Sequence, residues 1–346
     1  MALEVSPERL LALPKADLHV HLDGSLRPDT MLELADGLGV SLPASNPSAL
    51  AAALKVSGSR NLAEYLEKFS TTLSVMQSPG ALERTAYELA EDSAAENIRY
   101  LEVRYSPALH TEKGMSLEEA VVAPLRGLAR AETEFGIRTG LIICGIRSFD
   151  PSVSLDLAEL AVAFKDQGVV AFDLAGAEAG NPARVHREAF QRAADHNLAI
   201  TVHAGEGDGA DSVAQAIHEC HARRIGHGTR LMEDPALEAF VNDFRIPLEV
   251  CLTSNVQTRV APSFAEHPFR RYFDAGLIVT LNTDNRLLSG TTLTEEYWLA
   301  HQHLDLTWDE LVEVALLGFQ AGFLPYEAKV NLLEEVEEEL AGMERI

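Results

Sequence analysis

The sequence predicts an α/β fold, a (β/α)8 TIM barrel. Short apolar and β-branched segments recur along most of the chain and alternate with amphipathic, helix-like stretches, which is the order expected of parallel β/α units. An open doubly wound sheet is the alternative, but no G-x-G-x-x-G phosphate loop follows the first predicted strand. Eight predicted strands favour a closed barrel. They cover residues 16–22, 98–107, 138–147, 169–176, 199–206, 223–228, 246–255 and 277–284.

Residues 29–97, after the first predicted strand, form a segment too long for an ordinary crossover. Their pattern is mostly helical, so we expect extra helices that cover the C-terminal mouth of the barrel. The acidic stretch at residues 327–345 predicts a closing surface helix. Internal repeats, low-complexity tracts and linkers are absent from the sequence, so residues 1–346 are predicted to form a single metal-dependent barrel domain.

The chain is strongly acidic, with 28 basic and 53 acidic residues and a net charge of −25. Such a field repels phosphate backbones and anionic membranes, so we expect no nucleic-acid or membrane partner, whereas a neutral small molecule is compatible with it. The sequence shows neither a secretion-signal pattern nor an apolar run near the roughly 20 residues of a spanning helix. Three separated cysteines fit reduced thiols, so the expected location is cytoplasmic. The oligomeric state stays open.

The stretch ADLHVHLDGS, residues 16–25, places His19 and His21 two positions apart. On a strand two such residues share one face, so both imidazoles would point to the same side near its C-terminal end. Asp23 and Gly24 follow directly and are typical of a turn. Taken alone, such a pair is more often chance than a metal site. The interpretation therefore depends on partners elsewhere in the chain.

Candidate partners for the histidine pair fall where other predicted strands end. In a barrel these ends converge on the face where active sites are built. Three imidazole nitrogens and one carboxylate oxygen there would form a ligand set suited to Zn²⁺ or another divalent transition metal. The four candidate ligands are His19, His21, His203 and Asp284.

Two further residues suggest proton transfer beside this metal site. Glu206 lies three residues beyond His203, past the predicted strand end, where it could act as an acid or base without ligating. His227 lies between Gly226 and Gly228 and has little steric cover, so it could approach a metal-bound water, whose pKa the ion lowers towards neutrality. Asn285 offers amide donors and an acceptor for a substrate edge.

In their order along the chain, these motifs resemble those of the adenosine deaminase family, purine deaminases of the amidohydrolase superfamily. The resemblance extends from about residue 14 to at least residue 297. It implies one Zn²⁺ per chain and hydrolytic deamination of adenosine and 2′-deoxyadenosine to inosine or 2′-deoxyinosine and ammonia. The motifs are HVHLDGS, DLAGAE, TVHAGE, RIGHG, SN and NTD.

The resemblance also implies catalytic roles for individual residues. Metal-activated hydroxide would attack purine C6 while Glu206 protonates N1. His227 would take the proton of the water, and Asp284 would help to orient that water. The resemblance implies the same four zinc ligands as the spacing does, namely His19, His21, His203 and Asp284.

Four residues are expected to bind the purine nucleoside. Gly176 matches the glycine whose backbone N–H meets the purine N3, and Asp23 matches a carboxylate near the ribose 5′-hydroxyl. Adenine-specific relatives more often have H-L-E-G at the first motif, so HLDG favours the nucleoside. The expected substrate-binding residues are His21, Asp23, Gly176 and Asn285.

Two positions depart from the family pattern. Many members have a second Asp that contacts the purine N7, where this chain has Asn285 followed by Arg286, and many have Asp in place of Ala177. A neutral amide can still donate to N7, so both changes bear on substrate preference more than on catalysis. The alternatives are therefore a deaminase of adenine or of a modified adenosine, and an idle barrel that acts as a binding protein.

Three other features are given structural interpretations. HECH, residues 218–221, is predicted on a helix between the fifth and sixth strands with a solvated face. HQH, residues 301–303, lies in a helix-like segment in which the two histidines diverge. Asp173 is predicted to be structural or to orient another side chain.

Overall fold

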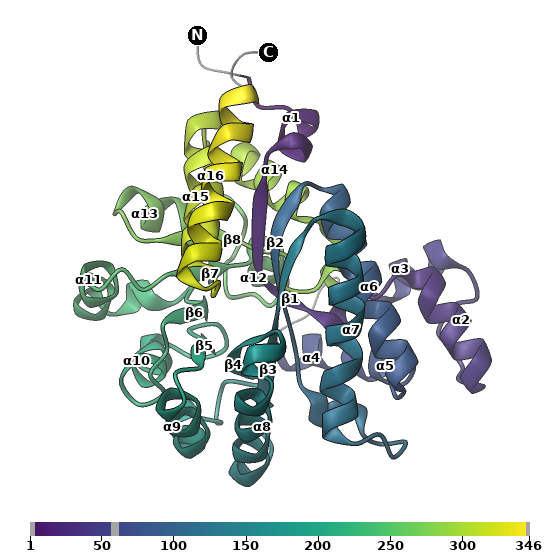
Figure 1. The fold of residues 1–346 in the computed structure, drawn as a ribbon. Helices are drawn as coiled ribbons and strands as arrows, with labels where there is room; N and C mark the ends of the chain where they lie inside the picture. Colours follow the sequence, from purple (N-terminus) through teal and green to yellow (C-terminus); the bar gives the residue numbers. More distant parts are fainter. Residues whose placement is uncertain (1–3, 57–61, 344–346) are drawn as a thin grey trace.

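The computed structural model describes residues 4–56 and 62–343, and eight parallel strands form its centre. Each strand pairs with the next in chain order, from β1 to β8, and helices surround them (Figure 1). The predicted (β/α)8 barrel is therefore confirmed. The strands are β1 (Lys15–His21), β2 (Ile98–Tyr105), β3 (Arg138–Ile146), β4 (Val169–Ala175), β5 (Ala199–Ala204), β6 (Arg224–His227), β7 (Leu248–Val250) and β8 (Val279–Leu281).

The barrel closes at three of the predicted metal ligands themselves. The backbone N–H of His21 donates to the carbonyl of Asp284 at 2.6 Å, and the N–H of Asp284 donates to the carbonyl of His19 at 2.8 Å. Below this point the N–H of Leu18 donates to Oδ1 of Asn282 at 2.8 Å. The open-sheet alternative is excluded, and the seam itself fixes three of the four candidate ligands.

The strand boundaries differ from prediction mainly at the seventh strand. It was expected to cover 246–255, but β7 ends at Val250 and α12 (Leu252–Gln257) follows at once. The polar run at 253–255 leaves the sheet because Asn255 is drawn inward to hydrogen-bond His227. Likewise β5 ends at Ala204, which leaves Glu206 in a loop beyond the strand.

The outer layer consists of helices whose ends follow local sequence signals. Ser116 and Glu119 form a capping box at the start of α7, and Thr292 with Glu295 does the same for α14. These helices are α6 (Pro79–Ala95), α7 (Leu117–Phe135), α8 (Pro151–Ala163), α9 (Arg187–Asp195), α10 (Ala210–His218), α11 (Pro235–Asp243), α13 (Phe269–Asp274), α14 (Leu293–Leu304) and α15 (Trp308–Ala321).

The helical segment after β1 divides into three parts. The predicted cover over the mouth is formed by α4 (Leu62–Leu66) and α5 (Phe69–Leu73), which supply residues that line the pocket. By contrast, α2 (Pro28–Leu38) and α3 (Pro47–Leu54) lie to one side of the barrel (Figure 1). The last helix, α6, packs beside α7 in the outer layer as an ordinary crossover helix.

The acidic C-terminal segment forms α16 (Tyr326–Met343), as predicted. Leu332 and Val336 are buried in a cluster with Ala16, Tyr100 and Phe319, so the helix covers the end of the barrel opposite the pocket. The N-terminal helix α1 (Pro7–Ala12) lies near it (Figure 1). None of the helices in the described residues has the length and apolarity to cross a membrane.

The two histidine-rich motifs outside the site have structural roles. HQH lies on α14, where Nδ1 of His301 donates to the carbonyl of Leu306 at 2.8 Å and His303 stacks on Phe264. In HECH the expected solvated face is correct for the exposed His218 and His221. Cys220, the third residue of the motif, is buried between them, and the helix expected for the whole motif ends at His218.

Candidate active site

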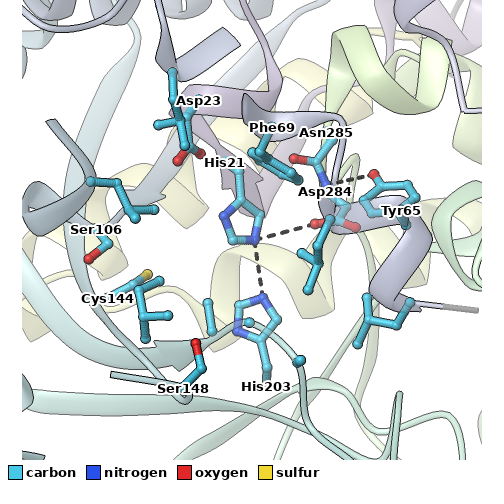
Figure 2. Close-up of a pocket in the computed structure, with 18 of the residues that line it drawn as sticks. His21, Asp23, Tyr65, Phe69, Ser106, Cys144, Ser148, His203, Asp284 and Asn285 are labelled. Carbon is cyan, nitrogen blue, oxygen red and sulfur yellow. Dashed lines mark hydrogen bonds and ion pairs between the residues drawn. The ribbon is translucent and has the colours of Figure 1, made fainter. Parts of the chain in front are cut away.

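A cavity of ≈ 400 Å³ opens at the carboxyl ends of the strands. Its walls are mostly apolar, with polar side chains converging on its floor (Figure 2). Eight of the nine predicted site residues line it together, and the ninth, His19, lies beneath them in contact with the rings of His21 and His203. The eight are His21, Asp23, Gly176, His203, Glu206, His227, Asp284 and Asn285.

The four predicted ligands form a compact donor cluster, with ligand atoms all within 4.8 Å of one another. Nε2 of His21 lies 3.1 Å from Nε2 of His203 and 3.4 Å from Oδ1 of Asp284 (Figure 2). Nε2 of His19 is buried without a hydrogen-bond partner and lies 3.5 Å from the same oxygen. The residue types and the close spacing of these donor atoms match a metal site, so the four residues could hold a metal ion.

The electrostatics of the cluster suit a metal ion. Burial lowers the pKa of His203 and holds that of His21 well below its usual value, so both imidazoles keep a free lone pair at neutral pH. Burial alone would raise the pKa of Asp284, but the hydrogen bond and charge of His19 hold it well below its usual range. His21 and His203 therefore offer neutral nitrogens, and Asp284 offers an anionic oxygen.

Two functional residues have left-handed backbone conformations. The φ angles are 59° at Asp284 and 64° at His227, a region that non-glycine residues adopt at a cost of roughly 1–3 kcal/mol. The barrel seam holds the backbone of Asp284, and the side chain of Asn255 holds the ring of His227. Such strain directs both side chains into the cavity instead of along the strand.

Glu206 faces His227 across the floor, with Oε2 of the carboxyl 3.5 Å from Nε2 of the ring. Only 6% of Glu206 is exposed. Burial raises its pKa well above the usual value, and the negative charges of Asp284 and Glu178 add to this. The raised pKa favours the protonated form of the carboxyl, which is the form that a general acid requires.

A chain of hydrogen bonds sets the tautomer of His227. The backbone N–H of Phe269 can only donate, and it donates to Nδ1 of His267 at 3.1 Å. Burial lowers the pKa of His267 to about 3, so this neutral ring carries its proton on Nε2, 3.1 Å from Oδ1 of Asn255. Nδ2 of Asn255 then donates to Nδ1 of His227 at 3.1 Å. A neutral His227 therefore presents Nε2–H to the cavity.

A buried layer of charged residues lies beneath the four candidate metal ligands. Nδ1 of His19 lies 2.9 Å from Glu249, and Nδ1 of His203 lies 2.9 Å from Asp173. Arg104 bridges the two carboxylates, at 2.8 Å from Glu249 and 3.0 Å from Asp173. The expectation that Asp173 orients another side chain is confirmed. Sequence reasoning missed Glu249 and Arg104, although a charged residue inside an apolar strand was a usable signal.

The two ends of the cavity differ in their polar groups. At one end Nδ2 of Asn285 donates to the hydroxyl of Tyr65 at 2.8 Å, while Oδ1 is buried without a partner. Asp23 and Ser106 lie at the other end, on the far side of His21 (Figure 2), and each has a buried side-chain oxygen without a partner. Asp23 and Ser106 line one end of the cavity and Asn285 lines the other, so a ligand in it would meet polar groups at both ends.

Gly176 lies directly after β4 on the cavity wall. Its φ angle of 99° lies in the region that favours glycine, which explains the residue type at this position. Ala177, the departure noted beside it, also lines the cavity. Tyr65, which comes from α4, was not identified from the sequence because nothing in its local pattern indicates which helix reaches the mouth.

Fold and site together define a class of protein: a parallel barrel with a cluster of candidate metal ligands and a buried carboxyl group at the carboxyl ends of its strands. Within this class, the chain belongs to the adenosine deaminase family, whose model matches residues 14–339. It is a hydrolase that acts on C–N bonds.

Individual relatives agree with this membership. The adenosine deaminase of Clostridium acetobutylicum is 40% identical over 331 residues, which cover 95% of this chain and 99% of the relative. The probable adenosine deaminase of Dictyostelium discoideum is also 40% identical, but this chain spans only 43% of its length.

Two solved structures share the fold over nearly the whole chain. Adenine deaminase from Arthrobacter aurescens has a TM-score of 0.88 and 28% identity, covering 95% of this chain and 99% of its own. An amidohydrolase from Burkholderia ambifaria with bound Zn has a TM-score of 0.88 and 25% identity, covering 99% of this chain and 97% of its own.

Proposed function

We propose that the protein hydrolyses adenosine and 2′-deoxyadenosine to inosine and 2′-deoxyinosine, with release of ammonia. One observation carries the proposal: a single cavity joins a cluster of four candidate metal ligands, a buried carboxyl group with a raised pKa, and polar side chains at both ends. Family membership supports the reaction, and the polar groups at the Asp23 end support a substrate that carries a sugar.

We propose Zn²⁺ as the ion. Three imidazole nitrogens and one carboxylate oxygen are a common ligand set for zinc, and the structural neighbour from Burkholderia ambifaria carries it. When bound, the ion lowers the pKa of water so that a nucleophile is available at neutral pH. The residues that would hold it are His19, His21, His203 and Asp284.

The side chains on the cavity floor divide the proton transfers between them. Glu206 gives its proton to the purine N1 as the nucleophile adds to C6. Because the proton of neutral His227 already lies on Nε2, this ring donates a hydrogen bond to the attacking oxygen. The proton of the water passes to the carboxylate of Asp284 and from there to the 6-amino group, so that the C6–N bond breaks and ammonia leaves. His227 thus orients the water in our proposal, in place of the base role that the resemblance implied.

The cavity ends select the two halves of a nucleoside. Gly176 and Asn285 face the purine, with the backbone N–H of the glycine at N3 and the amide of the asparagine at N7. With Nδ2 donating to Tyr65 and Oδ1 packed against Gly24, where a Cβ atom would lie 1.8 Å from it, the second hydrogen of Nδ2 is the donor for N7. At the other end the carboxylate of Asp23 accepts a hydrogen bond from a ribose hydroxyl, and the hydroxyl of Ser106 donates one to a ribose oxygen.

The charge of the cavity favours a nucleoside over a nucleotide. None of the described residues that line it is a lysine or an arginine, whereas four are carboxylic acids. A 5′-phosphate would meet Asp23 with no compensating cation, and a buried phosphate needs one. The four acids are Asp23, Glu67, Glu206 and Asp284.

The substrate proposal is tested by comparing adenosine, 2′-deoxyadenosine, adenine and AMP with the zinc-loaded protein. We expect kcat/KM for the two nucleosides to exceed that for adenine and AMP by at least about 10²-fold, since one charged or polar pairing lost in a buried site costs roughly this much. Ammonia release and the ultraviolet change from aminopurine to oxopurine measure it. In Asp23→Asn we expect the preference over AMP to shrink.

The outcomes separate the alternatives. Preference for adenine would keep the chemistry and refute the sugar-binding role of Asp23. Absence of turnover with all four compounds and with modified adenosines, in protein that holds its metal, would favour a binding protein instead.

Metal removal should abolish turnover and lower thermal stability together. A chelator would leave the facing nitrogens of His19, His21 and His203 without their ion, and an ion bound only by the folded state stabilises it by mass action, about 4 kcal/mol at 1,000 times Kd. Differential scanning calorimetry and metal analysis before and after Zn²⁺ is restored provide the measurement. Full activity in a metal-free preparation would contradict the zinc proposal.

A further inference from the structure

The loop that carries Glu206 is anchored by a carboxylate from a neighbouring loop. Four consecutive backbone N–H groups, of residues 205–208, donate to the side chain of Glu178. Gly205 donates to Oε1 at 2.8 Å, and the next three donate to Oε2 at 3.0, 2.6 and 3.0 Å. Successive N–H groups that converge in this way form an anion-binding nest, and here the anion belongs to the protein itself.

The backbone of this loop is shaped to hold the carboxylate. Gly205 has a φ of 69°, in the region that favours glycine. At Gly207 a Cβ atom would lie 3.0 Å from Leu62 and 3.2 Å from Cβ of Glu178, so a side chain there would press on the anchor. Only 3% of Glu178 is exposed. A buried carboxylate is stable only when such hydrogen bonds replace its water.

Other contacts also act on this loop, since the N–H of Arg230 donates to the carbonyl of Gly205 at 2.9 Å and the side chain of Glu206 hydrogen-bonds Thr258, but neither of them holds the N–H of Glu206. Strand β5 ends at Ala204, so sheet hydrogen bonds end before the catalytic carboxyl, and α10 begins only at Ala210. The N–H of Glu206 itself is one of the four that Glu178 holds. Its main chain is thereby set, and with it the direction in which its side chain leaves the loop towards His227.

We propose that Glu178 is the positioning residue for Glu206, an inference that rests on the function proposed above. Glu178 does not touch the reacting atoms in this role. It holds the donor carboxyl at the distance and angle needed to reach N1. The carboxylate of Glu178 holds residues 205–208 and not the metal ligands, and Gly176, two residues before it, would meet the purine through its own backbone N–H, so loss of the anchor should lower kcat while KM and metal content change little.

The test is Glu178→Gln in the full-length, zinc-loaded protein. A glutamine has one acceptor oxygen in place of two, so it can satisfy at most three of the four N–H groups, and it turns an amide N–H₂ towards the remainder. We expect kcat to fall by about 10²-fold, the usual effect of a displacement near 1 Å at a reacting group, with KM within about threefold of wild type. Hydrogen–deuterium exchange of residues 205–208 should accelerate.

Two further variants complete the design. Glu188→Gln makes the same charge change on the exposed face of α9 and should leave kcat and exchange at 205–208 unchanged. Glu178→Asp keeps the charge but is one methylene shorter, so it should recover part of the lost kcat. It also provides a second test if the glutamine variant does not fold.

Each result has a definite meaning. Wild-type kcat in Glu178→Gln overturns the inference while the proposed function stands. Loss of metal or a large rise in KM alongside kcat would show a general structural role and overturn it as well. A zinc-loaded wild-type protein that deaminates no purine overturns the proposed function and this inference together.

Discussion

In Glu206→Gln, kcat should fall by about 10²–10⁴-fold, the range that positioned general acid–base groups contribute. The amide has nearly the same shape as the carboxyl and can donate a hydrogen bond, but it cannot transfer a proton to N1. KM and bound zinc should change little, since Glu206 is not among the four donors of the metal cluster. Steady-state kinetics with adenosine and metal analysis of the same preparation measure both.

The proposed role of Glu206 also predicts the direction in which kcat changes with pH. Catalysis requires protonated Glu206, so kcat should be highest below the pKa of this group and fall as the pH rises through it. Burial and the charges of Asp284 and Glu178 raise that pKa, which extends the active range towards neutrality. The decline on the basic side should disappear in Glu206→Gln.

A matched control separates this effect from simple charge removal. Glu219→Gln makes the same substitution at an exposed position just after α10 and should retain wild-type kcat. If Glu206→Gln kept kcat within tenfold of wild type, Glu206 would not be the proton donor and another group would have to protonate N1.

The sequence was sufficient to predict the barrel and the contents of the cavity, for a physical reason. Alternating strands and helices leave few topologies, and a barrel brings every strand end to one face. His21, His203 and Asp284 lie far apart in the chain, yet that convergence alone places them in contact. The four-residue donor cluster is the part of the site that the positions of the strand ends predict directly.

Contacts between strands beneath that face could not be predicted in the same way. Arg104 and Glu249 are 145 residues apart, and each lies inside a strand whose apolar pattern gives no register. Glu178 is part of the DLAGAE motif, so the residue could be singled out from the sequence. Its four hydrogen bonds could not be predicted, because they depend on the path of the loop after β5. The length of β7 was overestimated because β-like composition continues through Cys251 and Leu252 after pairing stops.

The buried charges beneath the metal cluster allow the second large effect to be predicted. Glu249 is fully buried and accepts from four groups. Oε2 lies 2.9 Å from His19 and 2.8 Å from Arg104, while Oε1 lies 2.6 Å from Arg224 and 2.8 Å from Thr201. Although burial opposes its charge, the two arginines hold the pKa of Glu249 well below the usual value. Its stabilising effect is therefore present at neutral pH and is lost as the pH falls through that lowered pKa.

Glu249→Gln should cost about 3–5 kcal/mol of unfolding free energy, because it leaves two buried arginines with too little negative charge. It should also weaken metal binding by about 10- to 100-fold, since Nδ1 of His19 loses the carboxylate that orients the ring. Denaturant unfolding and competitive zinc titration measure the two effects.

The exposed pair of Arg138 and Glu335 provides the comparison. It has a similar distance, 2.7 Å, but lies on the surface, so Glu335→Gln should cost no more than about 1 kcal/mol and leave zinc affinity unchanged. If both variants lost the same small unfolding free energy, the buried charges would be screened by solvent as strongly as the surface pair. The orientation of His19 would then have to come from the metal itself. A large loss confined to Glu249→Gln would show that the catalytic face of the barrel depends on charges buried one layer beneath it.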